Sequence, residues 1–526
     1  MTTVTTGRTT TAVQPPLPAR AAALAGIAAG LGALVVGEVA GRVVPGAAPP
    51  LVAVGDTVIR LAPPALRDGG IEAFGTADKP ILLVTIAVVI AGLAALAGML
   101  ARLHPREGEA AVALLGAVAL VAQLAKAGTT SAGGLCAAAL TVVVGIVLLR
   151  ALMGRVPWRA PDPRPEAAPT WSRRAFILRS SVVIAVATVG GTVAQWLDGR
   201  VDVDRIRALR VLRPPVRPAP GDVLGSTVDV PGISPLFTPN RDFYRIDTAL
   251  VVPAIDPETW SLGITGMVDR PLSLTYDELL AMPQFEADIT MQCVSNEVGG
   301  ELVGNARWQG VLLKDLLEIA GVQRGAGQVV GRSVDDFTAG FPTEVALDGR
   351  PAMVALGMNG EPLPQLNGFP ARLVVPGLYG YVSATKWLQA IELTTWEGFD
   401  GFWVPRGWSK LGPVKLASRI DVPRDSSTVA AGSVVVAGVA WAPGPKRGVV
   451  KVEVSVDDGD WTEADLGGAL SQDAWRQWRA TVELAPGQHV LKVRATDRTG
   501  VVQDASRRAQ RPDGATGHHG VLVVAR

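Results

Sequence analysis

The chain has 526 residues, a formal net charge of +1 at pH 7 and a mean hydropathy of +0.30. The balanced charge, with no basic stripe that carries interleaved aromatic residues, argues against a nucleic-acid-binding protein. The length allows several domains. The apolar excess is confined to the first 200 residues, and from about Pro214 onward the composition is that of a soluble protein.

Five apolar runs in the N-terminal third are long enough to span, or nearly span, a bilayer. They are Ala21–Val44, Ile81–Ala101, Ala110–Ala125, Gly133–Leu149 and Ala175–Leu197. The third and fourth runs are short, which leaves buried or re-entrant segments as their alternative. Arginines cluster before the first run and in the loops that follow the second and fourth runs. The positive-inside rule therefore predicts a cytoplasmic N-terminus and an extracytoplasmic soluble part, on a multi-pass protein of the cell membrane.

The start of the fifth run reads Ser172-Arg173-Arg174-Ala175-Phe176-Ile177. This motif at residues 172–177 resembles a twin-arginine export signal placed inside the chain. The serine before the arginine pair and the phenylalanine after it favour that interpretation over an arginine pair that only obeys the positive-inside rule. The resemblance implies export of a folded protein, often with a cofactor already inserted.

Few ionisable groups lie inside the five runs. None of the runs contains a histidine, so we expect no membrane haem b held by two histidines. Glu38 is the one ionisable residue well inside a run. It either marks a function or reaches the membrane interface from the outer end of its helix.

Beyond a predicted transmembrane domain at 1–200, a linker at 201–225 contains the stiff sequence Pro214–Pro220 (PPVRPAP). An α+β domain at 226–412 follows. Trp260–Gly266 alternates like a strand, Thr275–Met282 reads as a short helix capped by Thr275, and Leu312–Ala320 reads as a helix that Gly321 ends.

The last domain, at 413–526, has the pattern of short strands separated by turns. The predicted strands are Val434–Trp441, Val449–Val456, Trp478–Leu484 and His489–Thr496. Strands of this length and spacing predict an immunoglobulin-like β-sandwich.

Cysteine usage singles out one residue of the soluble part. The chain has two cysteines, and Cys136 lies in the fourth apolar run, so Cys293 is the lone thiol outside the membrane domain. Exported domains normally pair their cysteines as disulfides. A buried, inert thiol is the ordinary explanation of such a residue, and the surroundings of Cys293 decide against it.

Five ordered segments surround Cys293 in the α+β region. They are Met291–Asn296 (MQCVSN), Ala306–Leu313 (ARWQGVLL), Met358–Pro364 (MNGEPLP), Asn367–Gly377 (NGFPARLVVPG) and Tyr379–Leu388 (YGYVSATKWL). In this order they resemble the sulfite oxidase family of molybdopterin enzymes. The resemblance covers about Pro239–Lys410, and the predicted sandwich matches the family's C-terminal dimerisation domain, which implies a homodimer.

The resemblance implies a molybdenum-molybdopterin cofactor and assigns roles to individual residues. Molybdenum is held by two dithiolene sulfurs of the pterin and one protein thiolate, and Cys293 matches that ligand. A cationic side chain such as Arg372 can grip the pterin phosphate with two hydrogen bonds. The full set of expected cofactor contacts is Asn240, Tyr244, Arg245, Ser333, Asp335, Asn367, Arg372, Thr385 and Lys386. Taken singly, Asn367 would be a turn residue and Arg372 a strand residue in an ion pair.

The sequence departs from sulfite oxidases near the expected substrate. Val294-Ser295-Asn296-Glu297-Val298 stands where those enzymes have Ala-Gly-Asn-Arg-Arg, and a carboxylate there opposes an anionic substrate. Trp408 replaces the family's active-site tyrosine, and Arg245 or Arg406 is a candidate to restore positive charge. The expected catalytic residues are Cys293, Arg245 and Trp408.

We therefore predict an extracytoplasmic oxidoreductase that moves an oxo group to or from a small substrate and exchanges electrons with a separate carrier, such as a cytochrome or a membrane quinone. The family average favours oxidation of sulfite or a similar oxyanion. Asn367 and the missing arginines favour reduction of an S-oxide, as in the methionine-sulfoxide reductase branch. The alternative from another class is a cofactor-free surface binding protein, with the sandwich as its recognition module. A further possibility is that the first four helices carry quinone or a partner subunit.

Overall fold

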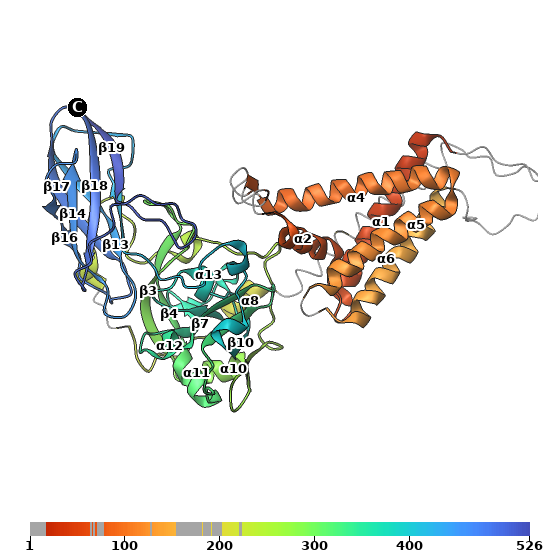
Figure 1. The fold of residues 1–526 in the computed structure, drawn as a ribbon, viewed down its shortest axis with the longest axis horizontal. Helices are drawn as coiled ribbons and strands as arrows, with labels where there is room; N and C mark the ends of the chain where they lie inside the picture. Colours follow the sequence, from red (N-terminus) through yellow and green to blue (C-terminus); the bar gives the residue numbers. More distant parts are fainter. Residues whose placement is uncertain are drawn as a thin grey trace, which may run out of the picture. The chain divides into compact units, whose positions relative to one another are not determined.

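The computed structural model describes residues 17–63, 78–126, 129–153, 202–219 and 223–526, with the isolated residues Leu66, Gly69, Gly70, Ser181 and Gly191. The chain divides into two compact units, Met1–Arg200 and Val201–Arg526 (Figure 1). The twin-arginine-like motif and, apart from two isolated residues, the fifth apolar run lie outside the described residues.

The first unit consists of helices. They are α1 (Ala19–Val43), α2 (Pro50–Leu61), α4 (Asp78–Leu103), α5 (Pro105–Leu124) and α6 (Ser131–Leu152). Within the described residues, four of them, α1, α4, α5 and α6, are long and apolar enough to cross a membrane. The predicted third and fourth runs form helices of 20 and 22 residues, longer than their apolar stretches.

Small residues let these helices approach one another closely. Gly26 of α1 faces Gly98 of α4, and a Cβ atom added to Gly26 would lie 2.1 Å from the carbonyl oxygen of Ala94. Such contacts are typical of helix packing in membranes, where close backbone approach replaces the hydrophobic effect. Glu38 accepts hydrogen bonds from Arg42 and from the backbone of Leu51 at the start of α2, so its carboxylate has a structural role.

Two five-stranded sheets form the framework of the central part of the second unit. One has the order β2 (Leu272–Thr275), β1 (Ser261–Gly266), β10 (Leu388–Thr394), β5 (Gln328–Ser333), β6 (Thr338–Pro342). The other contains β3 (Phe285–Gln292), β4 (Val303–Leu312), β7 (Met353–Met358), β8 (Glu361–Pro362) and, paired with β7, β9 (Arg372–Val374). A single core cluster includes buried residues of both sheets and of helices α10 (Tyr276–Ala281) and α11 (Leu313–Ala320).

The local predictions in this domain are confirmed. The Thr275 side chain accepts a hydrogen bond from the backbone of Glu278, whose carboxylate bonds back to Thr275, which makes a capping box at the start of α10. Helix α11 ends at Gly321, whose φ of 73° suits glycine. The predicted linker contains α8 (Val203–Ala208), and further on Val216 donates to the carbonyl of Gln284, so this segment lies along the start of β3.

The C-terminal part is rich in strands, as predicted. One sheet has the order β11 (Ala417–Val422), β13 (Gly432–Trp441), β17 (Arg476–Leu484), β16 (Asp465–Leu466). The other has β12 (Ser427–Val429), β19 (His519–Ala525), β18 (Gly487–Asp497), β14 (Val449–Val456), β15 (Thr462–Glu463). Buried residues of both sheets form one hydrophobic cluster, and Figure 1 shows this blue region beside the green and cyan central domain.

Candidate active site

Cys293 begins a tight loop directly after strand β3. Its backbone donates to the carbonyl of Leu302, and the Asn296 side chain accepts a hydrogen bond from the backbone of Leu302, so the two ends of the loop are held together. The thiol is buried and Sγ accepts a hydrogen bond from the Ser295 backbone at 3.4 Å. Burial raises the pKa of Cys293, which favours the neutral thiol near pH 7.

The C-terminal domain braces this loop. Trp441 Nε1 donates to the buried side chain of Gln292 at 2.8 Å, one residue before Cys293. Arg419 donates to the carbonyl of Gly300 at 2.7 Å. Gly299 has a φ of 80°, and a Cβ atom there would lie 2.1 Å from the His519 ring. The strand-rich C-terminal part therefore also shapes the loop that carries Cys293.

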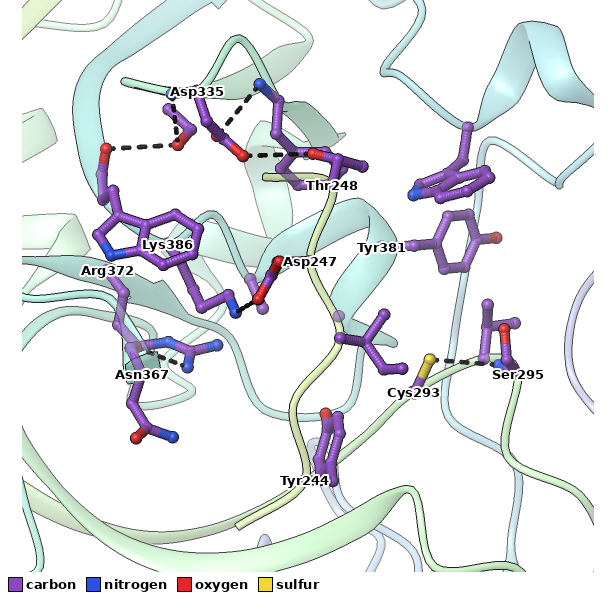
Figure 2. Close-up of a pocket in the computed structure, with 18 of the residues that line it drawn as sticks. Tyr244, Asp247, Thr248, Cys293, Ser295, Asp335, Asn367, Arg372, Tyr381 and Lys386 are labelled. Atoms are coloured by element: carbon purple, nitrogen blue, oxygen red, sulfur yellow. Dashed lines mark hydrogen bonds and ion pairs between the residues drawn. The ribbon is translucent and has the colours of Figure 1, made fainter. Parts of the chain in front are cut away.

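A buried guanidinium lies across the pocket from Cys293 (Figure 2). Arg372 of β9 is 5% exposed, donates to the carbonyl oxygen of Asn367 at 3.0 Å and lies over the Trp308 ring. Among the described residues no carboxylate lies within the 4.0 Å of an ion pair with it. Burial lowers the pKa of Arg372 to about 10, which is the mark of a desolvated charge that lacks an anion.

A glycine allows the cationic side chains to approach each other. Gly368 has a φ of 113°, and a Cβ atom there would lie 3.1 Å from Lys386 Cβ and 3.2 Å from Arg372 Cβ. A larger residue would therefore be strained and would push the two apart. Lys386 Nζ binds the carboxylate of Asp247 at 2.8 Å.

The pocket is open to solvent and brings together most of the residues expected from the sequence. Those that line it are Tyr244, Cys293, Ser333, Asp335, Asn367, Arg372, Lys386 and Trp408. Burial raises the pKa of Tyr244, and Cys293 nearby raises it further. Asp335 accepts a hydrogen bond from the Thr248 hydroxyl at 3.3 Å.

Three expected contacts do not line the pocket. The Asn240 side chain donates hydrogen bonds to the carbonyl of Met358 and the carboxylate of Glu361, and it accepts one from the Asn359 side chain. These bonds stabilise the turn that contains Asn359. Thr385 is fully buried and packs against Gly331. Arg245 contributes indirectly, because its Nε binds Asp247 at 2.8 Å and Asp247 lines the pocket.

Aromatic side chains form one wall of the pocket. Tyr381, Trp403 and Trp408 line the pocket, and the rings of Trp403 and Trp408 meet edge to face. The Arg511 guanidinium, from the loop between β18 and β19, lies 5.3 Å from the Trp408 ring. Glu297 accepts a hydrogen bond from Gln510 and does not line the pocket, so the carboxylate expected to oppose an anion lies outside it.

Comparisons with known proteins identify the family of the chain. The family described as "Oxidoreductase molybdopterin binding domain" matches residues 249–403, and "Mo-co oxidoreductase dimerisation domain" matches residues 413–510. Chicken (Gallus gallus) sulfite oxidase is 30% identical over 319 residues, which cover 51% of this chain and 68% of that enzyme. The chain belongs to the sulfite oxidase family. It is a molybdenum-dependent oxidoreductase whose cofactor is molybdenum-molybdopterin, which overturns the alternative of a cofactor-free binding protein.

Other relatives of this sulfite oxidase family member match smaller parts. "Uncharacterized oxidoreductase YuiH" of Bacillus subtilis (strain 168) is 36% identical over 157 residues, 30% of this chain and 76% of that protein. Human mitochondrial sulfite oxidase is 32% identical over 303 residues, 49% of this chain and 55% of that enzyme. The chain thus spans about half the length of the mammalian relatives that it matches.

The sequence reasoning missed several residues that the fold brings to the site. Asp247 lies two positions after Arg245, and no local pattern marks it as a pocket residue. The sequence favours a core position for Trp387, yet this residue lines the pocket beside Lys386. Arg511 comes from a different domain, more than 200 residues from Cys293 in the chain, so no spacing rule reveals it.

Proposed function

We propose that this protein is a membrane-anchored, extracytoplasmic oxo-transfer enzyme in which Cys293 is the protein ligand of molybdenum. The observation that carries the proposal is one pocket that combines a buried thiol with a buried guanidinium lacking a carboxylate partner among the described residues. A soft thiolate suits molybdenum, and an uncompensated arginine suits the pterin phosphate. The donor set therefore fits the cofactor.

Each residue has a distinct task in this proposal. When bound, the cofactor supplies oxo transfer and the two-electron change of the metal. Cys293 would hold the metal as a thiolate, in the loop that Asn296 closes. Arg372 and Lys386 hold the anionic end, and the side chains of Tyr381, Trp403 and Trp408 restrict access of water and substrate.

Sulfite or a similar oxyanion is the substrate that we favour. Arg511 lies over Trp408, where positive charge collects an anion, and Glu297 lies outside the pocket. A second candidate is an S-oxide reductase. It is supported by Asn367 in the pocket lining and by the aromatic wall, which suits a neutral organic substrate.

The test is electron paramagnetic resonance of the full chain purified from its own membranes. A Mo(V) signal produced by sulfite supports sulfite oxidation. A signal produced by dithionite alone contradicts it and favours the S-oxide reaction. C293S, which keeps a hydroxyl in place of the thiol, should lose both the signal and metal-dependent turnover, and full activity of C293S would refute the role of Cys293.

Membrane anchoring and location are part of the proposal. Four of the helices described in the first unit support an anchor, and the arginine distribution supports an extracytoplasmic catalytic domain that follows the twin-arginine-like motif at 172–177. Protease added to intact spheroplasts should cleave the region after Val201. Protection of that region until the membrane is lysed would contradict the orientation.

The arrangement of the C-terminal strands supports an immunoglobulin-type sandwich. If β11, β13, β17 and β16 are named A, B, E and D, the other sheet reads A′-G-F-C-C′, which is the division of strands of that fold. We propose domain limits of 226–412 and 413–526, a homodimer formed through the second of these, and electron exchange with a cytochrome or a membrane quinone. Sedimentation of the detergent-solubilised chain tests the dimer.

A further inference from the structure

A buried carboxylate, Asp247, joins Lys386 of the pocket lining to Arg245, which lies outside the lining. Oδ2 of Asp247 lies 2.8 Å from Arg245 Nε and 2.8 Å from Lys386 Nζ. The Asp247 side chain is 3% exposed, whereas Arg245 is 40% exposed. Figure 2 shows the Asp247–Lys386 contact on the side of the pocket that holds Arg372. A carboxylate in this place repels an anionic cofactor directly, so its contribution must pass through the cations that it binds.

The hydrogen bonds of Lys386 show what the carboxylate does. An ammonium group has three N–H donors. Lys386 Nζ gives one to Asp247 and one to the carbonyl of Leu366 at 3.3 Å, which leaves one donor for a ligand in the pocket that Lys386 lines. Two fixed partners restrict the position of an otherwise flexible side chain.

The charge of Lys386 depends on the same partner. Burial, Arg372 and Arg245 lower the pKa of Lys386 to about 8, and both contributions that raise it come from Asp247. Loss of the carboxylate would therefore favour a neutral amine near pH 7, and a neutral amine holds an anion weakly. Arg372 keeps its own charge at this pH, because its pKa is about 10.

We infer that Asp247 is a positioning residue, which holds Lys386 toward an anionic group of the molybdenum cofactor and so sets how tightly the protein retains that cofactor. The inference rests on the proposed seating of the cofactor against Arg372 and Lys386. It assigns to Asp247 a role in retention of the cofactor rather than in turnover of the substrate.

The experiment compares cofactor release from full-length wild type and D247N, each purified as the holoenzyme. Molybdenum and pterin that remain on the desalted protein are measured over time at pH 7 and at pH 9. At pH 7, D247N should release both about ten-fold faster, the effect of losing one charge-assisted hydrogen bond. Release from wild type should accelerate between pH 7 and pH 9 as Lys386 loses its proton, whereas release from D247N should change little.

The matched control is D288N, which removes another buried carboxylate that binds an arginine, Arg307, but does not line the pocket. D288N should release the cofactor at the wild-type rate, and D247E should restore most of the retention. The inference would be overturned if D247N released the cofactor at the wild-type rate and with the wild-type pH dependence. It would also be overturned if D288N released the cofactor as fast as D247N.

Two further variants distinguish a failure of this inference from a failure of the proposed seating of the cofactor against Arg372 and Lys386. If both D247N and R372Q retain the cofactor like wild type, the proposed seating of the cofactor is wrong. If R372Q releases the cofactor rapidly while D247N behaves as wild type, only the role of Asp247 is wrong. Where D247N does not accumulate, K386M serves instead. It should release the cofactor rapidly at both pH values, and a persisting acceleration between them would overturn the inference.

Discussion

The hydrogen bond between Trp441 and Gln292 gives a sharp test of how the C-terminal domain supports the active-site loop. W441F removes the donor that binds Gln292 Oε1 at 2.8 Å, directly before Cys293. Both side chains are buried, so the amide oxygen loses its partner away from bulk water. An unsatisfied buried acceptor costs about 1–3 kcal/mol.

Trp478 provides a matched control in the same domain. It is fully buried, and its Nε1 has no hydrogen-bond partner within the part of the chain that the structure describes. W478F removes the same volume as W441F and also deletes an unsatisfied donor, which returns about 1–3 kcal/mol. The volume terms largely cancel, so W441F should be less stable than W478F by about 2–6 kcal/mol.

The assay is thermal unfolding of the full chain in detergent, followed by tryptophan fluorescence, with molybdenum content measured in parallel. Each kcal/mol of that difference corresponds to about 2–4 °C in Tm for a domain of 150–250 residues, so W441F should unfold several degrees below W478F. W441F should also retain less molybdenum, because Gln292 adjoins Cys293 in the chain. Equal stability of W441F and W478F would refute the argument that this hydrogen bond braces the loop.

Three further substitutions probe the seam between the domains and the mouth of the pocket. G299A should destabilise the protein by at least about 2 kcal/mol, since it forces a side chain into a positive φ and against the His519 ring; unchanged Tm would count against this. Burial and Arg419 lower the pKa of His519, whose ring accepts a hydrogen bond from the Ile420 backbone and is also flanked by Asp421, Asp425 and Arg507. The contribution of the neutral ring to stability is therefore complete above pH 6.5 and is lost as the pH falls. H519Q should flatten the decline in Tm below that pH. R511Q should raise KM for sulfite about five-fold with little change in kcat and weaken the salt dependence of kcat/KM; an unchanged KM would remove Arg511 from substrate capture.

Local signals in the sequence were sufficient for several elements. The apolar runs predicted α1, α4, α5 and α6, because a bilayer requires long apolar helices whatever their neighbours are. Thr275 and Gly321 predicted the ends of α10 and α11, since capping depends on residues within one turn. Helix α2 was missed, because its 12 residues are short and fall in a stretch punctuated by proline and charge.

Part of the site was also readable before the fold was known. Cys293, Arg372 and Lys386 were identified from ordered segments that resemble the family, and all three line one pocket. Asn240 and Thr385 belong to the same segments but lie outside the lining. A motif fixes which residues are near one another along the chain, while the direction of each side chain depends on how the strand or turn that carries it packs.

The sequence by itself determined the family, the cofactor and the identity of the lone soluble thiol, because these depend on residue types in a fixed order. Only the tertiary structure decided that Asp247 joins Arg245 to Lys386, that Arg511 reaches Trp408 from another domain, and that Glu297 lies outside the pocket. The physical reason is that charge and hydrogen bonding act over a few ångströms in space, and folding brings together groups that are far apart in the chain.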